Sequence, residues 1–366
     1  MTTLHRISVP ADAEALVFPD PYRSNVELTE SMSTVDVRIP AHSAVTYSFQ
    51  SGELKYPDPH NAHGAGPQAS LLSGDSVDQT LWPPRSPEVI ADLPGARLSI
   101  DRKVFGRRCT ARLDDRGADT TVVFLDGDDW IHLHDLTGAL DRAVTAGLIP
   151  QINRVFLPAA KDRSEEYTSQ TFASALATEL PPIINSSHIV LVGQSFGGLS
   201  ALRAALTAST ETTPAIKGAI AQSPAVWWSA DRSAELADTL SDGPAGGDIA
   251  AQLTGPSLEN PAAHSGSGLA RIVLTCGAEE PPMQRHVDAV ADALTRRGFP
   301  PPITARPVAT TLRCGATGSS RHSPNCWAES TSAPPQTPPR ARLSADRRIR
   351  ARQPPLPALH AAVRRA

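Results

Sequence analysis

Residues 188–203, HIVLVGQSFGGLSALR, constrain the fold more than any other stretch, because an apolar run stops at Gly193 and a helical pattern begins after Ser195. This is the order strand, sharp turn and helix, with G-x-S-x-G in the turn, where a tight bend leaves no room for side chains. The turn lifts the Ser195 hydroxyl clear of the strand. The N–H of Phe196, at the start of the helix, can stabilise a negative charge. We predict Ser195 as a nucleophile and the Phe196 N–H as an oxyanion donor; the alternative is a chance spacing in a chain with 24 glycines.

Composition narrows the function classes. At 366 residues the chain exceeds what one hydrophobic core usually serves, so we expect two domains, and its 40% apolar content supports a folded core. The formal net charge of −4 gives no electrostatic reason to expect nucleic acid or an acidic membrane as a partner. No apolar run approaches the roughly 20 residues that span a bilayer, and the first ten residues lack the apolar core of a signal peptide. We therefore expect a cytoplasmic protein.

The four cysteines do not indicate a metal site or a disulfide framework. Cys109, Cys276, Cys314 and Cys326 are scattered without metal-ligand spacing. We expect four free thiols, no metal and no cofactor.

Residues 1–115 predict a small N-terminal β-sandwich. Short segments such as 35–39 and 44–49 alternate polar and apolar residues, with Pro and Gly between them. Residues 56–84 are rich in Pro, Gly and Ser and are interpreted as a linker, in which Asp58 and Asn61 serve as turn formers.

Residues 116–307 predict a doubly wound α/β sheet. Apolar strand-like runs at 120–125, 153–157, 189–193, 216–222 and 271–276 alternate with helical patterns. Ligands bind at the carboxyl ends of such strands. The Gly127 N–H, in the acidic loop after the first run, is our candidate second oxyanion donor. Residues 229–269 read as an insertion, either a mobile lid or a plain surface excursion.

Several short motifs, in order, resemble the enterochelin (enterobactin) esterase family of α/β-hydrolases. They are D-P-H-N at 58–61, L-D-G at 125–127 with Trp130, R-S-E-E-Y at 163–167, G-Q-S-F-G-G at 193–198, Q-S-P-A-V-W-W at 222–228, and G-A-E-E-P at 277–281. The resemblance covers residues 58 to about 308. It implies an immunoglobulin-like N-terminal domain and hydrolysis of the ester bonds of catecholate siderophores.

A serine hydroxyl needs a histidine to take its proton and a carboxylate to orient that histidine, in the chain order Ser, acid, His. Glu280 follows the last long strand-like run and matches the family's Glu before Pro. We predict Glu280 as the acid; the alternative is a solvated carboxylate that caps the following helix.

Three further residues are candidates for substrate binding. Arg163 could bind an anionic catecholate, or it could form a surface ion pair with Glu165 or Glu166. Trp227 and Trp228 could stack on an aromatic substrate, or they could be ordinary buried aromatics.

The general base has no convincing position in this chain. The family ends with a Gly-Gly-His-Asp segment, a Trp-Arg and a helix, whereas residues 308–366 hold ten arginines, no lysine and many prolines. Such a tail cannot bury enough surface to fold alone. His286 lies where the family has no catalytic residue, and His322 lies in the aperiodic tail.

A shifted reading frame accounts for this tail. Read from the third base of the preceding codon, the codons of residues 308–316 permit G-G-H-D-A-A-V-W-R, and the same frame continues into an amphipathic run. We therefore interpret the tail as a frameshift product; the alternative is an authentic basic tail that binds an acidic partner.

The sequence thus predicts a serine esterase for a small-molecule ester, such as an iron–siderophore complex, that is crippled if its histidine is lost. Two alternatives remain open: a general carboxylesterase of the same fold, and an inactive siderophore-binding protein.

Overall fold

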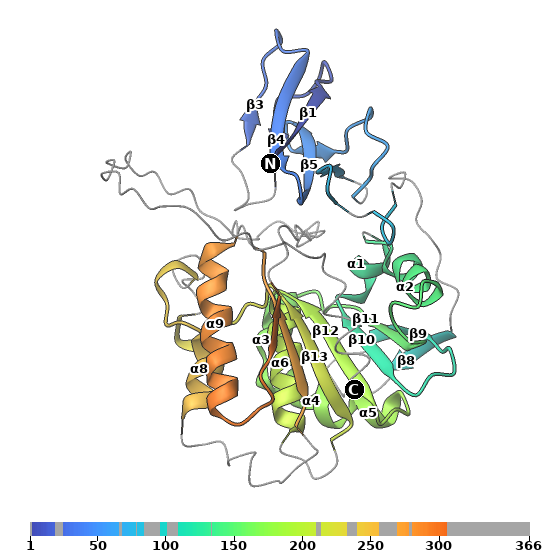
Figure 1. Ribbon diagram of the computed structural model, residues 1–366, viewed down its shortest axis with the longest axis vertical. Helices are drawn as coiled ribbons and strands as arrows, with labels where there is room; N and C mark the ends of the chain where they lie inside the picture. The colour runs from blue at the N-terminus through green and yellow to red at the C-terminus, as the bar shows by residue number, and fades with distance from the viewer. Residues whose placement is uncertain are drawn as a thin grey trace, which may run out of the picture.

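The computed structural model describes residues 2–305 with short gaps. The gaps are residues 19–24, 66–67, 78, 84–95, 101–108, 133, 210–213, 233–239, 256–268 and 278–279. Residues 308–366, the interpreted frameshift product, lie outside the described part, as do His264, His322 and His360. Figure 1 shows two parts, with small N-terminal sheets above a larger sheet flanked by helices.

The larger part is an eight-stranded mixed sheet with the order β15-β14-β13-β12-β10-β11-β9-β8. Its strands are β8 (Ala96–Ile100), β9 (Cys109–Asp114), β10 (Thr121–Leu125), β11 (Asn153–Leu157), β12 (Ile189–Gln194), β13 (Ile216–Gln222), β14 (Arg271–Thr275) and β15 (Ile303–Ala305). The six strands β15, β14, β13, β12, β10 and β11 are parallel to their neighbours in this order. Strand β9 pairs antiparallel with both β11 and β8. The predicted wound α/β sheet is confirmed, with an antiparallel strand at one side.

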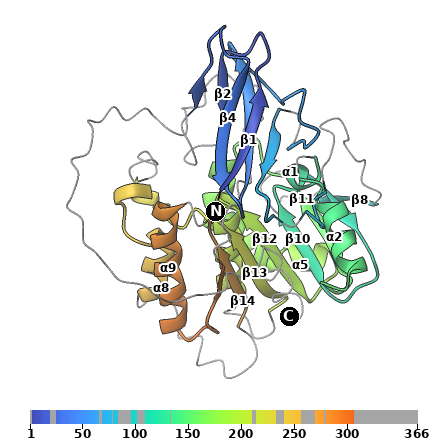
Figure 2. The same cartoon turned by 45° about the horizontal axis from the view of Figure 1, so that its top comes forward.

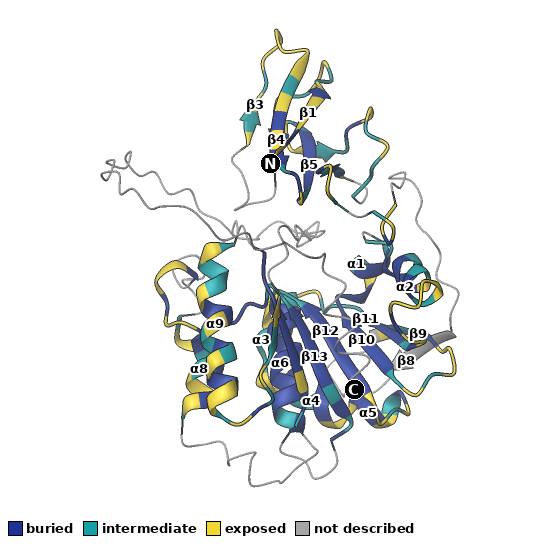
Figure 3. Ribbon diagram, viewed as in Figure 1, coloured by how far each residue is buried: buried dark blue, intermediate teal, exposed yellow. Residues whose placement is uncertain are grey.

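Helices cover both faces of this sheet (Figures 1 and 2). They are α1 (Gly127–His132), α2 (Leu136–Thr145), α3 (Arg163–Thr168), α4 (Gln170–Thr178), α5 (Leu180–Ile183), α6 (Phe196–Ala208), α8 (Gly247–Thr254) and α9 (Pro281–Arg296), with a 3-10 turn at Ala230–Arg232. Alternate residues of one strand enter different cores: Leu191 packs with the α4 and α6 side, and Val190 with the α1 and α2 side. A strand buried on both faces is apolar throughout, which explains the unbroken run before Gly193. Figure 3 shows the central strands buried and the outer faces of α8 and α9 exposed.

The N-terminal residues form two small antiparallel sheets around one core. β1 (Thr2–Ser8) pairs with β4 (Thr34–Pro40), and the second sheet contains β2 (Ala15–Val17), β3 (Val26–Glu27), β5 (Ala44–Ser51), β6 (Leu54–Tyr56) and β7 (Ser70–Ser73). Ile7 and Val37 from the first sheet pack with Phe49 from the second. The predicted boundary at residue 115 needs correction, because β8 and β9 belong to the large sheet. Both have the alternating pattern of an antiparallel strand, so the pattern alone did not assign them to a sheet.

The segment interpreted as a linker is partly ordered. The Tyr47 hydroxyl donates to the buried Asp58 carboxylate at 2.6 Å, and the Asn61 amide donates to the Tyr47 hydroxyl at 3.1 Å and to the Leu71 carbonyl at 3.0 Å. Asp58 and Asn61 therefore do more than form a turn. They join the chain after β6 to strands β5 and β7.

The described part of the 229–269 insertion is anchored to the body of the protein. Asp248, at the start of α8, accepts from the Ser229 hydroxyl at 2.9 Å and from the Ala230 N–H at 3.0 Å. Arg285 of α9 donates to the Leu240 carbonyl at 3.1 Å. The Gly246 N–H, just before α8, donates to His286 Nδ1 on α9 at 3.1 Å, and the two helices lie side by side (Figure 1).

Helix α6 begins so close to strand β12 that glycine is required at the turn. A Cβ built on Gly193 would overlap the backbone carbonyl of Gly197, and one on Gly198 would lie 3.0 Å from the Pro224 Cβ. The first overlap is with backbone, which cannot swing aside as a side chain can. The spacing of the motif therefore follows from the distance between strand and helix.

We expect Gly193→Ala to destabilise the fold by at least about 3 kcal/mol, because the overlap must push β12 and α6 apart. Gly138→Ala in α2 is the matched control: its Cβ would meet only the ends of Asp135 and Arg142 side chains, and alanine favours a helix by up to about 1 kcal/mol. Urea unfolding of both variants measures the difference. Equal stability of the two variants would contradict the close approach.

Candidate active site

Ser195 lies in a strained turn between β12 and α6, at the carboxyl edge of the sheet. Its φ of +55° and ψ of −122° are rare for a residue with a side chain and cost about 1–3 kcal/mol. Two backbone bonds hold it there: its N–H donates to the Gln222 carbonyl at 3.0 Å, and its carbonyl accepts from the Ala225 N–H at 2.9 Å. The turn is thus fixed to the segment that follows β13.

The two candidate oxyanion donors begin the helices that follow two neighbouring strands. Phe196 is the first residue of α6 and Gly127 the first of α1. Their strands, β12 and β10, are parallel neighbours, so both helices start at the same edge of the sheet. Asp126, just before Gly127, has a left-handed φ of +59°.

Arg163 contacts a different carboxylate from the two that we weighed. Its Nε donates to Asp126 Oδ1 at 2.6 Å and its Nη2 to Asp126 Oδ2 at 2.8 Å, and Nη2 also lies 3.1 Å from the Gln194 carbonyl. Glu166 instead accepts from the Ala160 N–H. Arg163 therefore pairs with Asp126, a partner that we did not weigh, and the side of the guanidinium predicted for a catecholate faces this carboxylate.

Glu280 is the residue just before α9, and its side chain does not cap the helix. Its Oε2 accepts from the Ser223 hydroxyl at 2.7 Å and from the Gly277 N–H at 2.8 Å, and its side chain makes no capping bond to α9. Capping was our alternative for this residue, and the contacts contradict it. Ser195 bonds to Gln222 at the end of β13, and the next residue, Ser223, bonds to Glu280. Glu280 follows β14, so it lies two strands away from β12, which precedes Ser195.

The two tryptophans make contacts within the protein. Trp227 is 9% exposed, with its ring centroid 5.8 Å from that of Phe196. The ring of Trp228 lies under the Arg203 guanidinium, 4.9 Å from its centroid. We had weighed Trp227 as a ring that stacks on substrate, but it is a core residue. Trp228 takes part in a cation–π contact.

Among the described residues, no histidine forms a hydrogen bond with the Ser195 hydroxyl. His286, one of the two that we weighed, is fully buried on α9. Its Nδ1 accepts from the Gly246 N–H at 3.1 Å and its Nε2 donates to the Leu240 carbonyl at 2.9 Å, so both ring nitrogens are occupied. Burial lowers the pKa of His286, which keeps the ring neutral in this role.

Comparison with known proteins identifies the family. A family profile described as "Putative esterase" matches residues 113–297, about half of the chain. The chain belongs to this esterase family. The iron(III) enterobactin esterase of Yersinia enterocolitica is 26% identical over 207 residues, which cover 50% of this chain and 54% of that protein. The chain thus spans about half the length of this curated relative.

Solved enterobactin esterases share the fold. The Shigella flexneri enzyme, solved in the presence of 2,3-dihydroxy-N-benzoyl-serine, superposes with a TM-score of 0.61 at 18% identity, covering 83% of this chain and 87% of its own. The ferric enterobactin esterase of Salmonella typhimurium gives 0.59 at 19% identity, covering 80% and 85%. The sequence resemblance to enterobactin esterases is confirmed.

Three residues of the esterase's site were missed in the sequence. The Asp126 N–H donates to the Tyr167 hydroxyl at 2.9 Å. Ser223 holds Glu280, as described above. Asp129, in the first turn of α1, has a pKa raised to about 6, chiefly by burial and in addition by the negative charge of Asp126. Tyr167 and Ser223 lie inside the quoted motifs, but the motifs do not show which atoms meet.

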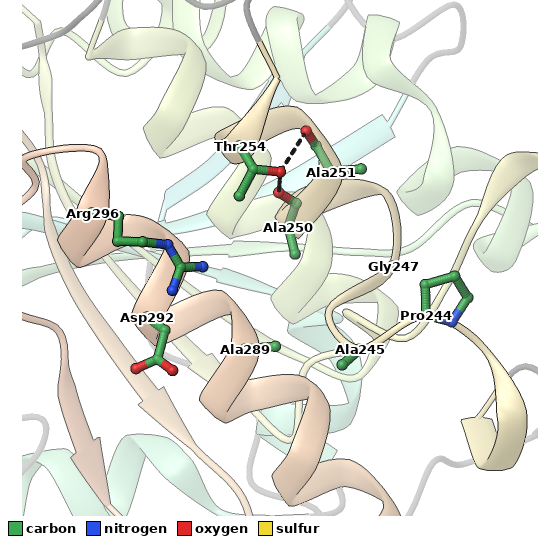
Figure 4. A pocket seen from close by; sticks show the side chains of 9 residues that line it. All are labelled: Pro244, Ala245, Gly247, Ala250, Ala251, Thr254, Ala289, Asp292 and Arg296. Atoms are coloured by element: carbon green, nitrogen blue, oxygen red, sulfur yellow. Dashed lines mark hydrogen bonds between the residues drawn. The ribbon is translucent and has the colours of Figure 1, made fainter.

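A hollow of about 400 Å³ lies between α8 and α9, away from these residues (Figure 4). Small side chains form most of its wall, with Thr254, Asp292 and Arg296 as its polar members. None of the candidate catalytic residues lines it. In the described parts of the esterase, no cluster of histidine, cysteine and carboxylate side chains is suited to a metal ion, and no helix is long and apolar enough to span a bilayer.

We expect Asp129→Asn to raise the melting temperature at pH 7.5 and to leave it nearly unchanged at pH 4. The pKa of Asp129 is higher in the folded protein than the ordinary value of about 4, so folding favours the protonated form. Below about pH 4 both states are protonated and folding carries no penalty; as the pH rises through 6 the folded state must hold a disfavoured charge. Asp292→Asn, which removes an exposed carboxylate from α9, is the control. A shift of equal size at both pH values would exclude this origin.

Proposed function

We propose that the chain has the scaffold of a serine esterase that hydrolyses ester bonds of a catecholate siderophore, for intracellular iron release. Ser195 is its nucleophile, Glu280 its acid, and the N–H groups of Phe196 and Gly127 its oxyanion donors. The observation that carries the proposal is the strained, glycine-framed turn at Ser195, which costs free energy and has no packing purpose for the hydroxyl it presents.

The position of Glu280 supports its role. Strands β12, β13 and β14 are consecutive neighbours, and Ser195, Ser223 and Glu280 follow them in that order. Both hydrogen bonds to the Glu280 carboxylate from the described residues reach Oε2. A histidine that bonds to the other oxygen would be oriented as a triad requires.

The base is proposed to come from the shifted reading frame. In the chain order Ser, acid, His, it follows Glu280. The next strand is β15, which pairs with β14, and the segment after it begins at residue 306. A histidine encoded there in the frame that reads G-G-H-D would enter beside the acid. We also propose that the N-terminal sheets are an immunoglobulin-like sandwich, supported by the core that they share.

Two alternatives each have an observation in their favour. The contacts of Arg163 and Trp227 with the protein leave the siderophore without a clear recognition group among the predicted residues, which favours a general carboxylesterase. The lack of a bond between Ser195 and any described histidine favours an inactive siderophore-binding protein. The enterobactin in the names of the Yersinia and Shigella relatives favours the siderophore esterase.

We expect the chain with its reading frame restored at codon 308 to hydrolyse enterobactin, and its Ser195→Ala variant to lose at least about 10³-fold in kcat without a change in melting temperature. Chromatography of the released dihydroxybenzoyl-serine measures the rate. The original chain should react slowly with a fluorophosphonate that labels activated serines. Rapid labelling of that chain would show that a working base is already present, and activity in the alanine variant would remove Ser195 from the mechanism.

We expect Glu280→Gln, made in the frame-restored chain, to lower kcat at neutral pH by about 10³–10⁴-fold, because a neutral amide stabilises the imidazolium poorly. The Gln carbonyl can still accept from Ser223, so the start of α9 should stay in place. Asp288→Asn, later on the same helix, is a control for loss of a carboxylate. Full activity in Glu280→Gln would show that the acid lies elsewhere.

A further inference from the structure

We propose that Arg163 and Asp126 form a positioning pair that sets the two oxyanion donors at a fixed separation. The inference deepens the proposed function and rests on it for the identity of those donors. It replaces the interpretation of Arg163 as a group that binds the substrate's charge.

The guanidinium of Arg163 joins the two segments that carry the donors. It forms a two-point ion pair with Asp126, the residue before Gly127, and its Nη2 also donates to the carbonyl of Gln194, the residue before Ser195. One planar group therefore touches the end of β10 and the end of β12. Only arginine offers several rigidly spaced donors in one plane, so a lysine could not make the same set of contacts.

Asp126 is held from its main chain as well. The hydroxyl of the fully buried Tyr167 accepts from the Asp126 N–H at 2.9 Å, and Tyr167 lies one turn after Arg163 on α3. The Arg163 guanidinium also lies 5.1 Å from the centre of the Tyr167 ring. Helix α3 thus clamps both the amide and the carboxylate of this residue.

The clamp acts where the backbone is strained. Asp126 has a φ of +59° and Ser195 a φ of +55°, and neither conformation persists unless its surroundings enforce it. The Asp126 carboxylate also lies close to the first turn of α6, since a Cβ built on Gly197 would be 3.0 Å from Asp126 Oδ2. An oxyanion hole depends on donors fixed before the reaction, so a contact that joins the two strained turns bears directly on the transition state.

The pair faces the protein more than the solvent. The Asp126 side chain is 8% exposed and that of Arg163 27%. A substrate anion would have to compete with a carboxylate already bound at two points. This geometry favours an effect on kcat over an effect on substrate affinity.

The test compares Arg163→Lys and Asp126→Asn with their parent chain by two readouts: ester hydrolysis in the frame-restored chain, where a base is expected, and amide exchange in the original full-length chain. The first is hydrolysis of p-nitrophenyl butyrate, which is neutral, and of mono-p-nitrophenyl succinate, which carries a carboxylate. A positioning pair predicts a fall in kcat of about 10–100-fold for both esters, with KM within about twofold. The second readout is amide hydrogen exchange by mass spectrometry, in which peptides across residues 126–131 and 194–199 should exchange at least about tenfold faster in both variants.

Glu165→Gln is the matched control, because it removes a charge from the exposed side of α3 and should change neither readout. A rise in KM for the succinate ester alone would show that Arg163 binds substrate, and would overturn the proposal. Faster exchange spread evenly over the protein would show an ordinary stabilising ion pair, and would overturn it too. Full activity in Arg163→Lys would also overturn the proposal, because lysine keeps the positive charge but cannot form the two-point contact with Asp126.

The two proposals can fail separately. If the frame-restored chain shows no hydrolysis that Ser195→Ala removes, the proposed function fails. The exchange readout needs no turnover: faster exchange confined to both segments still supports the pair, and unchanged exchange in either segment overturns it.

Discussion

The contact of β12 with the first turn of α6 is the constraint on which this site depends. It is possible only because Gly193 has no Cβ to meet the Gly197 carbonyl. The turn that results forces Ser195 into a rare backbone conformation and directs its hydroxyl away from the sheet. The free energy for this strain comes from the surrounding core, in which β12 is buried on both faces and α6 is buried along almost its whole length.

The same core explains how much of the fold was predictable. A strand covered on both faces must be apolar at every position, so the central parallel strands were visible as uninterrupted runs. The turn at Ser195 was visible because its glycines are a steric requirement. Strands β8 and β9 were assigned to the wrong part of the chain, because alternation indicates one exposed face and does not say which sheet the strand joins.

The site was less predictable, because its side chains meet across the fold. Arg163 and Asp126 are 37 residues apart in sequence, whereas Glu165 and Glu166 are close to Arg163 and were the obvious partners. Parallel strands bring the ends of β10 and β12 together, and this proximity outweighs nearness in the chain. Trp227 shows the converse: an aromatic residue after a strand looks like a binding platform in sequence, and only its contact with Phe196 places it in the core. The quoted motifs therefore did not determine which of these side chains bond to one another.

The Glu280 carboxylate, our proposed acid, is held in position without a bond to any described histidine. In a folded protein, a buried or half-buried carboxylate needs hydrogen-bond donors. Here the Ser223 hydroxyl and the Gly277 N–H supply them. Ser223 itself is fixed by its N–H, which donates to the Thr275 carbonyl at 2.6 Å. The carboxylate is thus oriented by the ends of β13 and β14 alone. Because β15 is the next strand along the same edge, a base from the segment after it would meet an acid already in place. In the proposed mechanism, loss of that segment would remove the proton transfer and leave the Ser195 turn and Glu280 in place.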